Sequence, residues 1–336
     1  MKVREVAFTQ LRQANPVTIA CYEESSAERW DEFVTTSNNG TLFHLRRFLR
    51  YHPPERFEDV SLIFEKERKW LSVMPAAVRQ EQDGRVLISH PGASFAGPVF
   101  KSSTSIKDTF FVVQALVEFA KAQGFSRIVL TLPPLVYLAR PSNYLEFALR
   151  EYGFTYLKRE VSSVIPLDFA EEDTLFIFSP ESRRAARKAM KSGVKVRESE
   201  DFESFYSILK RNLTLRHNVQ PTHTLEELLR LKSMLGDKIR LFGAFLDSRM
   251  IAGVVMFTCN SRVALAFYIS HLEAYQQYRS VNLLFYEVVR WAIRQRFRFL
   301  DFGIFTVQMK PNWGLARFKE SFGAQGVFRD TLVKIV

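Results

Sequence analysis

The chain has 336 residues, enough for two domains of ordinary size, and 47% of them are hydrophobic, as in folded globular proteins. No apolar run approaches the roughly 20 residues that cross a bilayer. The opening segment MKVREVAFTQLRQANP lacks the apolar core of a secretory signal. The net charge of +11 favours polyanionic partners, namely nucleic acid, phosphorylated ligands or an anionic membrane face. A basic surface that only serves solubility is an equal alternative.

The cysteines and histidines form no metal-binding motif, and a single disulfide is possible from the number of cysteines alone. Cys21 and Cys259 lie in apolar strand-like runs, one in each half, and we expect two buried, reduced thiols of a cytosolic protein. Six histidines occur without an HExxH or CxxC pattern, so no metal site is expected.

The first half alternates strands and helices, with three strand-like runs in succession and a hairpin turn at Gln82–Gly84. The predicted strands are Val17–Tyr22, Asp59–Glu65, Lys69–Arg79, Arg85–Pro91, Ser126–Leu132 and Phe154–Leu167, and the predicted helices are Ala27–Ser37, Phe43–His52, about Lys107–Gln123 and a segment after Ser142.

The second half repeats this order, with Thr222 or Thr224 as the cap of its second helix. The predicted strands are Val194–Glu198, Ile239–Ser248, Arg249–Cys259, Arg262–His271, Phe297–Ile304 and Gly326–Val336, and the predicted helices are Asp201–Arg216, His223–Leu235, Val281–Arg296 and a segment after Asn312. Each half therefore reads β, α, α, β, β, β, α, β, α, β. This α+β order fits neither a Rossmann sheet nor a TIM barrel, and it matches the order of the GNAT acyltransferase fold.

Two copies of one domain are also indicated by a direct repeat. Leu116–Leu130 (LVEFAKAQGFSRIVL) aligns with Val288–Phe302 (VVRWAIRQRFRFLDF), and each is followed by a short amphipathic segment that ends in aromatic-Gly. We expect domain 1 at residues 1–168 and domain 2 at residues 169–336, with a hinge near Asp168–Ser179. The chemistry should lie where the copies differ.

The strongest charged element is the segment SPESRRAARKAMKSG, Ser179–Gly193. Ser179 suits the helix N-cap, Pro180 the first helical position and Gly193 the end of the helix. Five cations share one side without an interleaved acid, which favours binding of phosphate over a merely solvated face. These predicted substrate contacts are Arg183, Arg184, Arg187, Lys188 and Lys191.

A second element is the junction that enters the helix Val281–Arg296. A helix N-terminus there could present N–H groups to the pyrophosphate of a donor. The candidate donor-binding residues are Gln277, Arg279, Ser280 and Asn282. Ser280 and Asn282 stand where GNAT enzymes usually have glycine, which weakens the expectation of ordinary coenzyme A binding.

The third element is the helix capped by Asn312. It carries Lys319 beside Phe318, where the first copy has Leu149. A lysine that replaces a leucine in the duplicate is a candidate for stabilising an acyl-transfer oxyanion or a donor phosphate, and a surface lysine over an aromatic patch is the simpler alternative. Asp301-Phe302-Gly303 spells the kinase motif, but no HRD loop accompanies it. Asp301 is instead a candidate strand-end carboxylate in the active cleft, or a cap of the following loop.

On these residues the chain resembles the FemABX family of peptidyltransferases, which contain two tandem GNAT-like domains. The resemblance rests on Trp30–His52, Ser182–Val196, Phe299–Gly303 and above all GLARFKESFGA at Gly314–Ala324. It implies transfer of an amino acid from aminoacyl-tRNA to an amine of a peptidoglycan precursor, with the Phe318–Lys319 pair assisting the transfer. It further implies precursor phosphates near the arginines after Ser182, with Arg47 or Arg50 and Tyr268 as further acceptor contacts. The tRNA-binding coiled-coil arm of some members is absent.

The sequence thus predicts an acyl or aminoacyl transferase in which an amine attacks an ester or thioester directly, Lys319 stabilises negative charge and Asp301 is a candidate base. The acceptor is a phosphorylated, UDP- or lipid-linked precursor in the cleft between the copies. The donor is aminoacyl-tRNA or acyl-CoA, and no tightly bound cofactor is expected. A CoA-dependent N-acyltransferase of polysaccharide sugars and a non-catalytic binder of nucleic acid or anionic lipid are the alternatives. We expect a cytoplasmic protein with peripheral contact to the inner face of the membrane, and its oligomeric state does not follow from the sequence.

Overall fold

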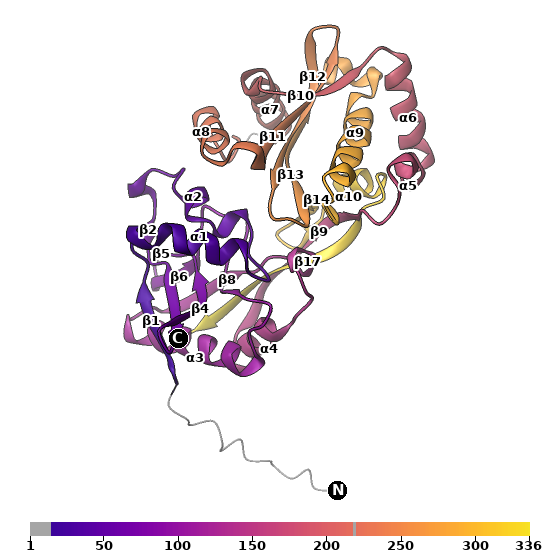
Figure 1. The fold of residues 1–336 in the computed structure, drawn as a ribbon. Helices are drawn as coiled ribbons and strands as arrows, with labels where there is room; N and C mark the ends of the chain where they lie inside the picture. The colour runs from indigo at the N-terminus through magenta and orange to yellow at the C-terminus, as the bar shows by residue number, and fades with distance from the viewer. Residues whose placement is uncertain (1–14, 218–219) are drawn as a thin grey trace, which may run out of the picture.

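The computed structural model describes residues 15–217 and 220–336, which form two lobes (Figure 1). The prediction that the chain has no secretory signal concerns its opening segment. That segment lies almost entirely outside the described residues. The first half contains strands β1 (Val17–Cys21), β2 (Glu58–Asp59), β3 (Leu62–Lys66), β4 (Lys69–Met74), β5 (Ala76–Glu81), β6 (Gly84–Ser89), β7 (Val99–Phe100), β8 (Arg127–Thr131) and β9 (Thr155–Pro166), and helices α1 (Ala27–Thr35), α2 (Arg46–Leu49), α3 (Ile106–Ala122) and α4 (Tyr144–Glu151).

The second half follows the predicted order of elements. It contains helices α5 (Thr174–Ile177), α6 (Pro180–Lys191), α7 (Phe202–His217), α8 (Leu225–Leu235), α9 (Ser280–Arg294) and α10 (Trp313–Glu320), and strands β10 (Lys195–Ser199), β11 (Ile239–Leu246), β12 (Arg249–Thr258), β13 (Val263–His271), β14 (Phe299–Ile304), β15 (Thr306–Val307), β16 (Lys310–Pro311) and β17 (Gln325–Ile335).

The predicted repeat is visible in the strand pairing. In each half a long helix, α3 or α9, connects two parallel neighbours, because β6 pairs with β8 and β13 pairs with β14 in parallel. The other neighbours in these sheets pair antiparallel. This combination of antiparallel strands with one helical crossover is the predicted α+β architecture.

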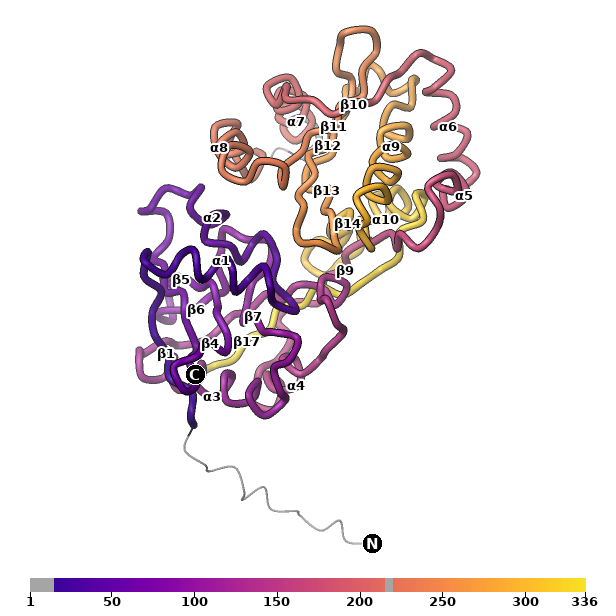
Figure 2. The backbone as a smooth tube through the Cα atoms, in the orientation of Figure 1, coloured from indigo at the N-terminus to yellow at the C-terminus, as the bar shows by residue number. Residues whose placement is uncertain are grey.

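The two halves exchange strands through one continuous sheet. Eleven strands run in the order β10-β11-β12-β13-β14-β9-β17-β8-β6-β5-β2, so β9 of the first half pairs with β14 of the second. Strand β17, at the end of the chain, runs back into the first half (Figure 2) and pairs there with β8. The division at residue 168 remains a prediction, and the pairing shows that each half completes its sheet with a strand from the other.

Three hydrophobic clusters hold this arrangement together. One spans both halves, where Phe43 of the first half packs against Phe95 and Phe257, and Phe257 stacks on Phe267. A second lies on the opposite face of the second sheet, under α6, α9 and α10, and a third lies between α3 and the strands of the first half. The first half therefore packs on one face of the second sheet, and helices α6 and α9 cover the other face (Figure 1).

Some predicted boundaries were wrong for local reasons. The predicted helix Phe43–His52 is α-helical only over α2, because a 3-10 turn at Leu42–His44 precedes it and the Asp31 carboxylate accepts the N–H of Arg46 at 2.6 Å. The predicted strand Lys69–Arg79 divides into β4 and β5, which belong to different sheets, since Pro75 between them has no N–H to continue a ladder. Cys259 is buried, but Cys21 is exposed; both are free thiols.

Several predicted helix ends are confirmed. Ser179 caps α6 by accepting the N–H of Ser182 at 3.2 Å, and Asn312 caps α10 by accepting the N–H of Leu315 at 3.1 Å. Thr224 and Glu227 form a capping box at the start of α8. None of the described helices combines the length and apolar character needed to span a membrane.

Candidate active site

The parallel strands β13 and β14 separate soon after they pair. Their ladder covers only Val263–Leu265 and Phe299–Asp301, after which β13 continues beside β12 alone. Asp301 is the last residue of β14 in this ladder. The sheet therefore opens at Asp301, and helix α9 begins beyond the end of β13.

Lys319 lies at this opening and is 3% exposed. Its Nζ donates to the carbonyl oxygens of Gly303 and Ile304, both at 2.7 Å. Burial lowers the pKa of Lys319 from 10.5 to about 8; the carboxylate of Asp301 opposes this shift and the nearby Arg329 adds to it. A lysine of this pKa carries its charge at neutral pH and can lose it within the physiological range.

The structure supports the comparison between the two copies. Leu149 of α4 is fully buried in the core of the first half, and Lys319 is buried at the matching position of α10. The lysine is therefore no surface side chain over an aromatic patch. Phe318, beside it, is half-buried and contacts Phe285 and Phe322, so its role here is to fix α10 against the core.

Asp301 is buried and held by three donors. The hydroxyl of Tyr137 donates to Oδ2 at 2.7 Å, and the Ser162 hydroxyl and the Gly303 N–H donate to Oδ1, both at 2.6 Å. The bond from Gly303, whose φ of +71° suits glycine, makes Asp301 the predicted cap of the following loop. Burial raises the pKa of Tyr137 well above its ordinary value, and the negative charge of Asp301 raises it further.

Three residues of this cluster were not found from the sequence. Tyr137, Ser162 and Arg329 come from a loop of the first half, from β9 and from β17. Burial lowers the pKa of Arg329, which lies within the electrostatic reach of Asp301, Tyr137 and Glu160. No local motif marks these residues, because the strand exchange brings them together.

The predicted donor junction forms a helix N-terminus. Arg279 precedes α9 with φ of +55°, a left-handed conformation that usually falls to glycine, and its carbonyl accepts the N–H of Asn282. Ser280 is buried, Asn282 is half-buried, and Gln277 and Arg279 are exposed. The first turn of α9 thus offers N–H groups beyond β13, and no side chain caps it.

The basic helix α6 lies away from the interface of the halves. It packs on α9, with Ala186 and Ala189 buried, on the face of the second sheet opposite to the first half. Arg183 is half-buried and donates to the carbonyls of Phe176 and Phe178, both at 3.3 Å. The exposed cations of this helix are Arg184, Arg187, Lys188 and Lys191. The expectation that they face a cleft between the copies is therefore wrong.

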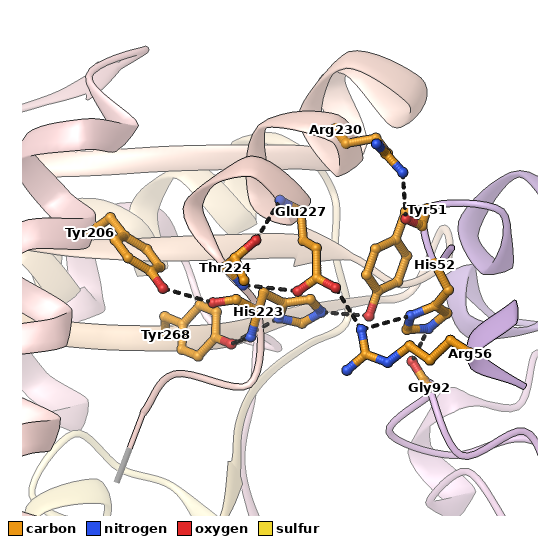
Figure 3. A network of polar contacts seen from close by, with 10 residues as sticks. All are labelled: Tyr51, His52, Arg56, Gly92, Tyr206, His223, Thr224, Glu227, Arg230 and Tyr268. Carbon is orange, nitrogen blue, oxygen red and sulfur yellow. Dashed lines mark hydrogen bonds and ion pairs between the residues drawn. The ribbon is translucent and has the colours of Figure 1, made fainter. Parts of the chain in front are cut away.

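The remaining predicted acceptor contacts lie at two different places, Arg47 on the first half and Tyr268 in a network between the halves. Arg47 forms an ion pair with Asp31 at 3.0 Å and stays half exposed. Tyr268 contacts Nδ1 of His223 at 2.8 Å, and Nε2 of the same ring contacts the hydroxyl of Tyr51 at 2.8 Å (Figure 3). The structure thus brings Lys319, Phe318 and Asp301 together, and leaves Arg47, Tyr268 and α6 at other sites.

The same polar network joins the two halves (Figure 3). Arg56 of the first half pairs with Glu227 at the start of α8 at 2.5 Å. His52 lies beside this pair, and burial lowers the pKa of His52 and of His223 to about 4. Both rings are therefore neutral at physiological pH. Among the described residues, no group of His, Cys, Asp and Glu side chains is arranged to hold a metal ion.

Comparisons with known proteins agree with this architecture. Residues 180–320 match the family described as "Acetyltransferase (GNAT) domain". The structure is similar to FemX, with a TM-score of 0.73 at 13% identity over 95% of this chain and 97% of that one. It is also similar to L-PGS from Bacillus licheniformis, with a TM-score of 0.58 at 10% identity over 92% and 91%. A tandem GNAT protein from the clavulanic acid biosynthesis pathway is similar as well, with a TM-score of 0.56 at 11% identity over 95% of this chain and 98% of that one. No curated protein matches the sequence.

Proposed function

We propose that this chain, an acyltransferase with the FemAB-like tandem GNAT fold, forms an amide on an amine of a phosphorylated cell-wall precursor. The observation that carries the proposal is the buried Lys319 at the point where β13 and β14 separate. Its ammonium group has three N–H bonds, of which two are directed at the carbonyls of Gly303 and Ile304. The third remains for an oxygen of the substrate.

In the proposed reaction the nitrogen of the acceptor amine attacks the carbonyl carbon of the donor. The carbonyl oxygen becomes negative in the tetrahedral intermediate, and the N–H of Lys319 stabilises it there. The intermediate collapses as the C–O bond of an ester or the C–S bond of a thioester breaks, and the proton that the amine nitrogen loses passes to the leaving oxygen or sulfur. No covalent intermediate with the protein is needed.

Asp301 acts in this mechanism as a positioning residue. Tyr137, Ser162 and Gly303 already donate to its two oxygens, so few lone pairs remain to accept a proton from the amine. Its negative charge instead favours the ammonium form of Lys319. This role replaces the sequence prediction that Asp301 is a candidate base.

The donor would bind on the α9 side of the opened sheet. The uncapped N-terminus of α9 and the exposed cations of α6, which packs against α9, favour the phosphates of a donor there. Aminoacyl-tRNA and acyl-CoA both carry such phosphates. The acceptor would approach from the side of the first half, where Tyr137 reaches Asp301.

Product analysis tests this function and separates the donors. The protein is incubated with UDP-linked or lipid-linked precursors that carry an amine and with either charged tRNA or acetyl-CoA. The masses of the products are then measured by mass spectrometry. We expect one donor to extend the precursor by one acyl or aminoacyl group, and Lys319→Met to lower the rate at least tenfold. Lys69→Met, which removes an exposed lysine at the start of β4, is the control for transfer chemistry.

Two outcomes would contradict the proposal. Wild-type turnover by Lys319→Met would remove the lysine from the mechanism. Failure of every donor with every amine precursor, combined with strongly salt-dependent binding of nucleic acid or anionic vesicles, would favour the non-catalytic alternative. Transfer from acetyl-CoA to amino sugars alone would favour the polysaccharide alternative.

A further inference from the structure

A pocket of about 440 Å³ lies where the first half meets one end of the second sheet. The first half contributes the segment that follows α1 and the loop around Tyr137, and the second half contributes the β12–β13 turn and the segments before β11 and after α9. Asn260 of the turn connects the two sides, because its side-chain N–H groups donate to the carbonyls of Gly40 and Tyr137 at 3.3 and 2.8 Å. A ligand in this interface pocket would therefore contact both halves.

The interface pocket is lined by two cations and by no carboxylate. The cations are Lys238 and Arg262, both half-buried, and the remaining polar side chains of the lining are uncharged. Within the part of the chain that the structure describes, neither cation forms an ion pair. Asp237, next to Lys238 in the chain, pairs instead with Arg240 at 3.6 Å. Two partly desolvated positive charges without a counter-ion favour an anion beside them.

The fold brings the charge of Lys238 to the wall of the interface pocket. Lys238 precedes β11 and lies level with Thr258, because Ile239 pairs with Phe257 in the antiparallel ladder. Burial raises the pKa of the Cys259 thiol, which lines the same pocket, and the positive charge of Lys238 opposes this rise. The ammonium group is thus within electrostatic reach of the pocket wall and not directed into open solvent.

Arg262 has a hydrogen-bond donor without a partner. Its Nε is buried and bonds to none of the described residues, and its guanidinium lies 5.9 Å from the centre of the Phe299 ring. Its main chain is fixed, because its N–H donates to the Asn260 side chain at 2.9 Å and its carbonyl accepts the N–H of Arg298 at 2.7 Å. An unpaired buried donor is costly, and an anion bound along the edge of the guanidinium would satisfy it.

The interface pocket lies apart from the transfer site. It includes Gln295 and Phe297, which follow the C-terminal end of α9, whereas the donor phosphates are proposed at the N-terminal end. For a helix of 15 residues these ends are about 22 Å apart. On the other side, Tyr137 lines the pocket and bonds to Asp301, and both side chains are buried, so they close the path toward Lys319. An anion in this pocket is therefore neither donor nor acceptor of the transfer.

We propose that the interface pocket binds a small dianionic metabolite, which bridges the two halves and stabilises their joined arrangement. A phosphate monoester or a dicarboxylate carries close to two negative charges at pH 7, which match the two cations, whereas a monocarboxylate leaves one cation unmatched. The organic part of the ligand would pack on the apolar side chains of Leu42, Leu45 and Phe297. The site does not depend on the proposed function.

Titration calorimetry with simple anions tests the site without any transfer. The probes are inorganic phosphate, glycerol phosphate, succinate and acetate, each added to the full chain at pH 7.5 and constant ionic strength. We expect at least one dianion to bind with a dissociation constant below about 1 mM, and acetate to bind at least tenfold more weakly. Glycerol phosphate and succinate separate the two sources of a dianion, because the first represents phosphorylated metabolites and the second dicarboxylic acids.

Variants decide whether the dianion binds in this pocket or at the N-terminus of α9. Lys238→Met and Arg262→Gln should each weaken binding at least fivefold, and exposed Lys69→Met, which lowers the net charge equally, should change it less than twofold. The ligand at ten times its dissociation constant should raise the midpoint of thermal unfolding by about 2 °C in the wild type and in Lys69→Met, and should not raise it in Lys238→Met. If Arg262→Gln fails to fold, Lys238→Met against Lys69→Met still decides the question.

Three results would overturn the site: no binding of any dianion at millimolar concentration, equal affinities for acetate and the dianions, or unchanged dianion binding by Lys238→Met. Lys319→Met should bind the dianion as the wild type does, since Lys319 lies outside the pocket. Dianion binding by a wild-type protein that transfers no acyl group would count against the proposed function and not against the interface pocket.

Discussion

Replacement of Lys319 by methionine should change how stability depends on pH. In the folded protein the pKa of Lys319 is about 8, against 10.5 for an ordinary lysine. Between these values the unfolded chain binds more protons than the folded one, so the free energy of unfolding rises with pH. From pH 7 to pH 9.5 this single lysine should add about 2 kcal/mol in the wild type. Lys319→Met has no such group and should lack this gain.

The measurement is urea denaturation of both proteins at pH 7 and pH 9.5, followed by circular dichroism. The quantity of interest is the difference between the two proteins in the pH effect, because all other titrating groups cancel. Lys191→Met, which removes an exposed lysine at the end of α6, should behave as the wild type. A difference below about 0.5 kcal/mol would refute the reasoning, since it would mean that burial does not perturb the titration of Lys319.

Two further predictions concern neighbouring charges. Arg329→Met removes a cation that lowers the pKa of Lys319. The fall in transfer rate above pH 8 should therefore move to higher pH by at least half a unit, whereas exposed Arg317→Met, the control, should leave it in place. An unchanged pH–rate profile of Arg329→Met would exclude this coupling. His223 contacts Tyr51 and Tyr268 and has a pKa of about 4 in the folded protein. Below pH 6.5 the imidazole is protonated in the unfolded chain but still neutral in the folded one, so the free energy of unfolding should fall as the pH drops. His223→Gln should lose about 2–3 kcal/mol less than the wild type between pH 7 and pH 4.5, and equal losses in urea titrations would contradict this.

The sequence predicted the elements of the second half because their signals are local. Apolar periodicity locates its strands, and side-chain caps such as Ser179 and Asn312 fix where its helices begin. Alignment of the copies also singled out Lys319, because a charged residue stands where the duplicate buries Leu149. Such differences between repeats can be read without a structure.

The environment of Lys319 could not be predicted in the same way. Tyr137, Ser162 and Arg329 reach Asp301 only because β9 and β17 cross between the halves, and strand patterns do not state which strands pair. The side of the sheet that α6 covers has the same origin. Its amphipathic pattern predicts a helix with one buried face, and only the tertiary fold decides that α9 receives it.

The strand exchange also sets the order in which the chain can fold. Thr131 of β8 pairs with Thr331 of β17, so the first half completes its sheet only after a segment some 200 residues later has been synthesised. Closing so long a loop is slow compared with forming hairpins and helices. During synthesis, the edge of β8 that β17 covers therefore stays exposed until β17 has been synthesised. We infer that the two halves reach the native state together, as one cooperative unit, and that the first half gains its full stability only when β17 is in place.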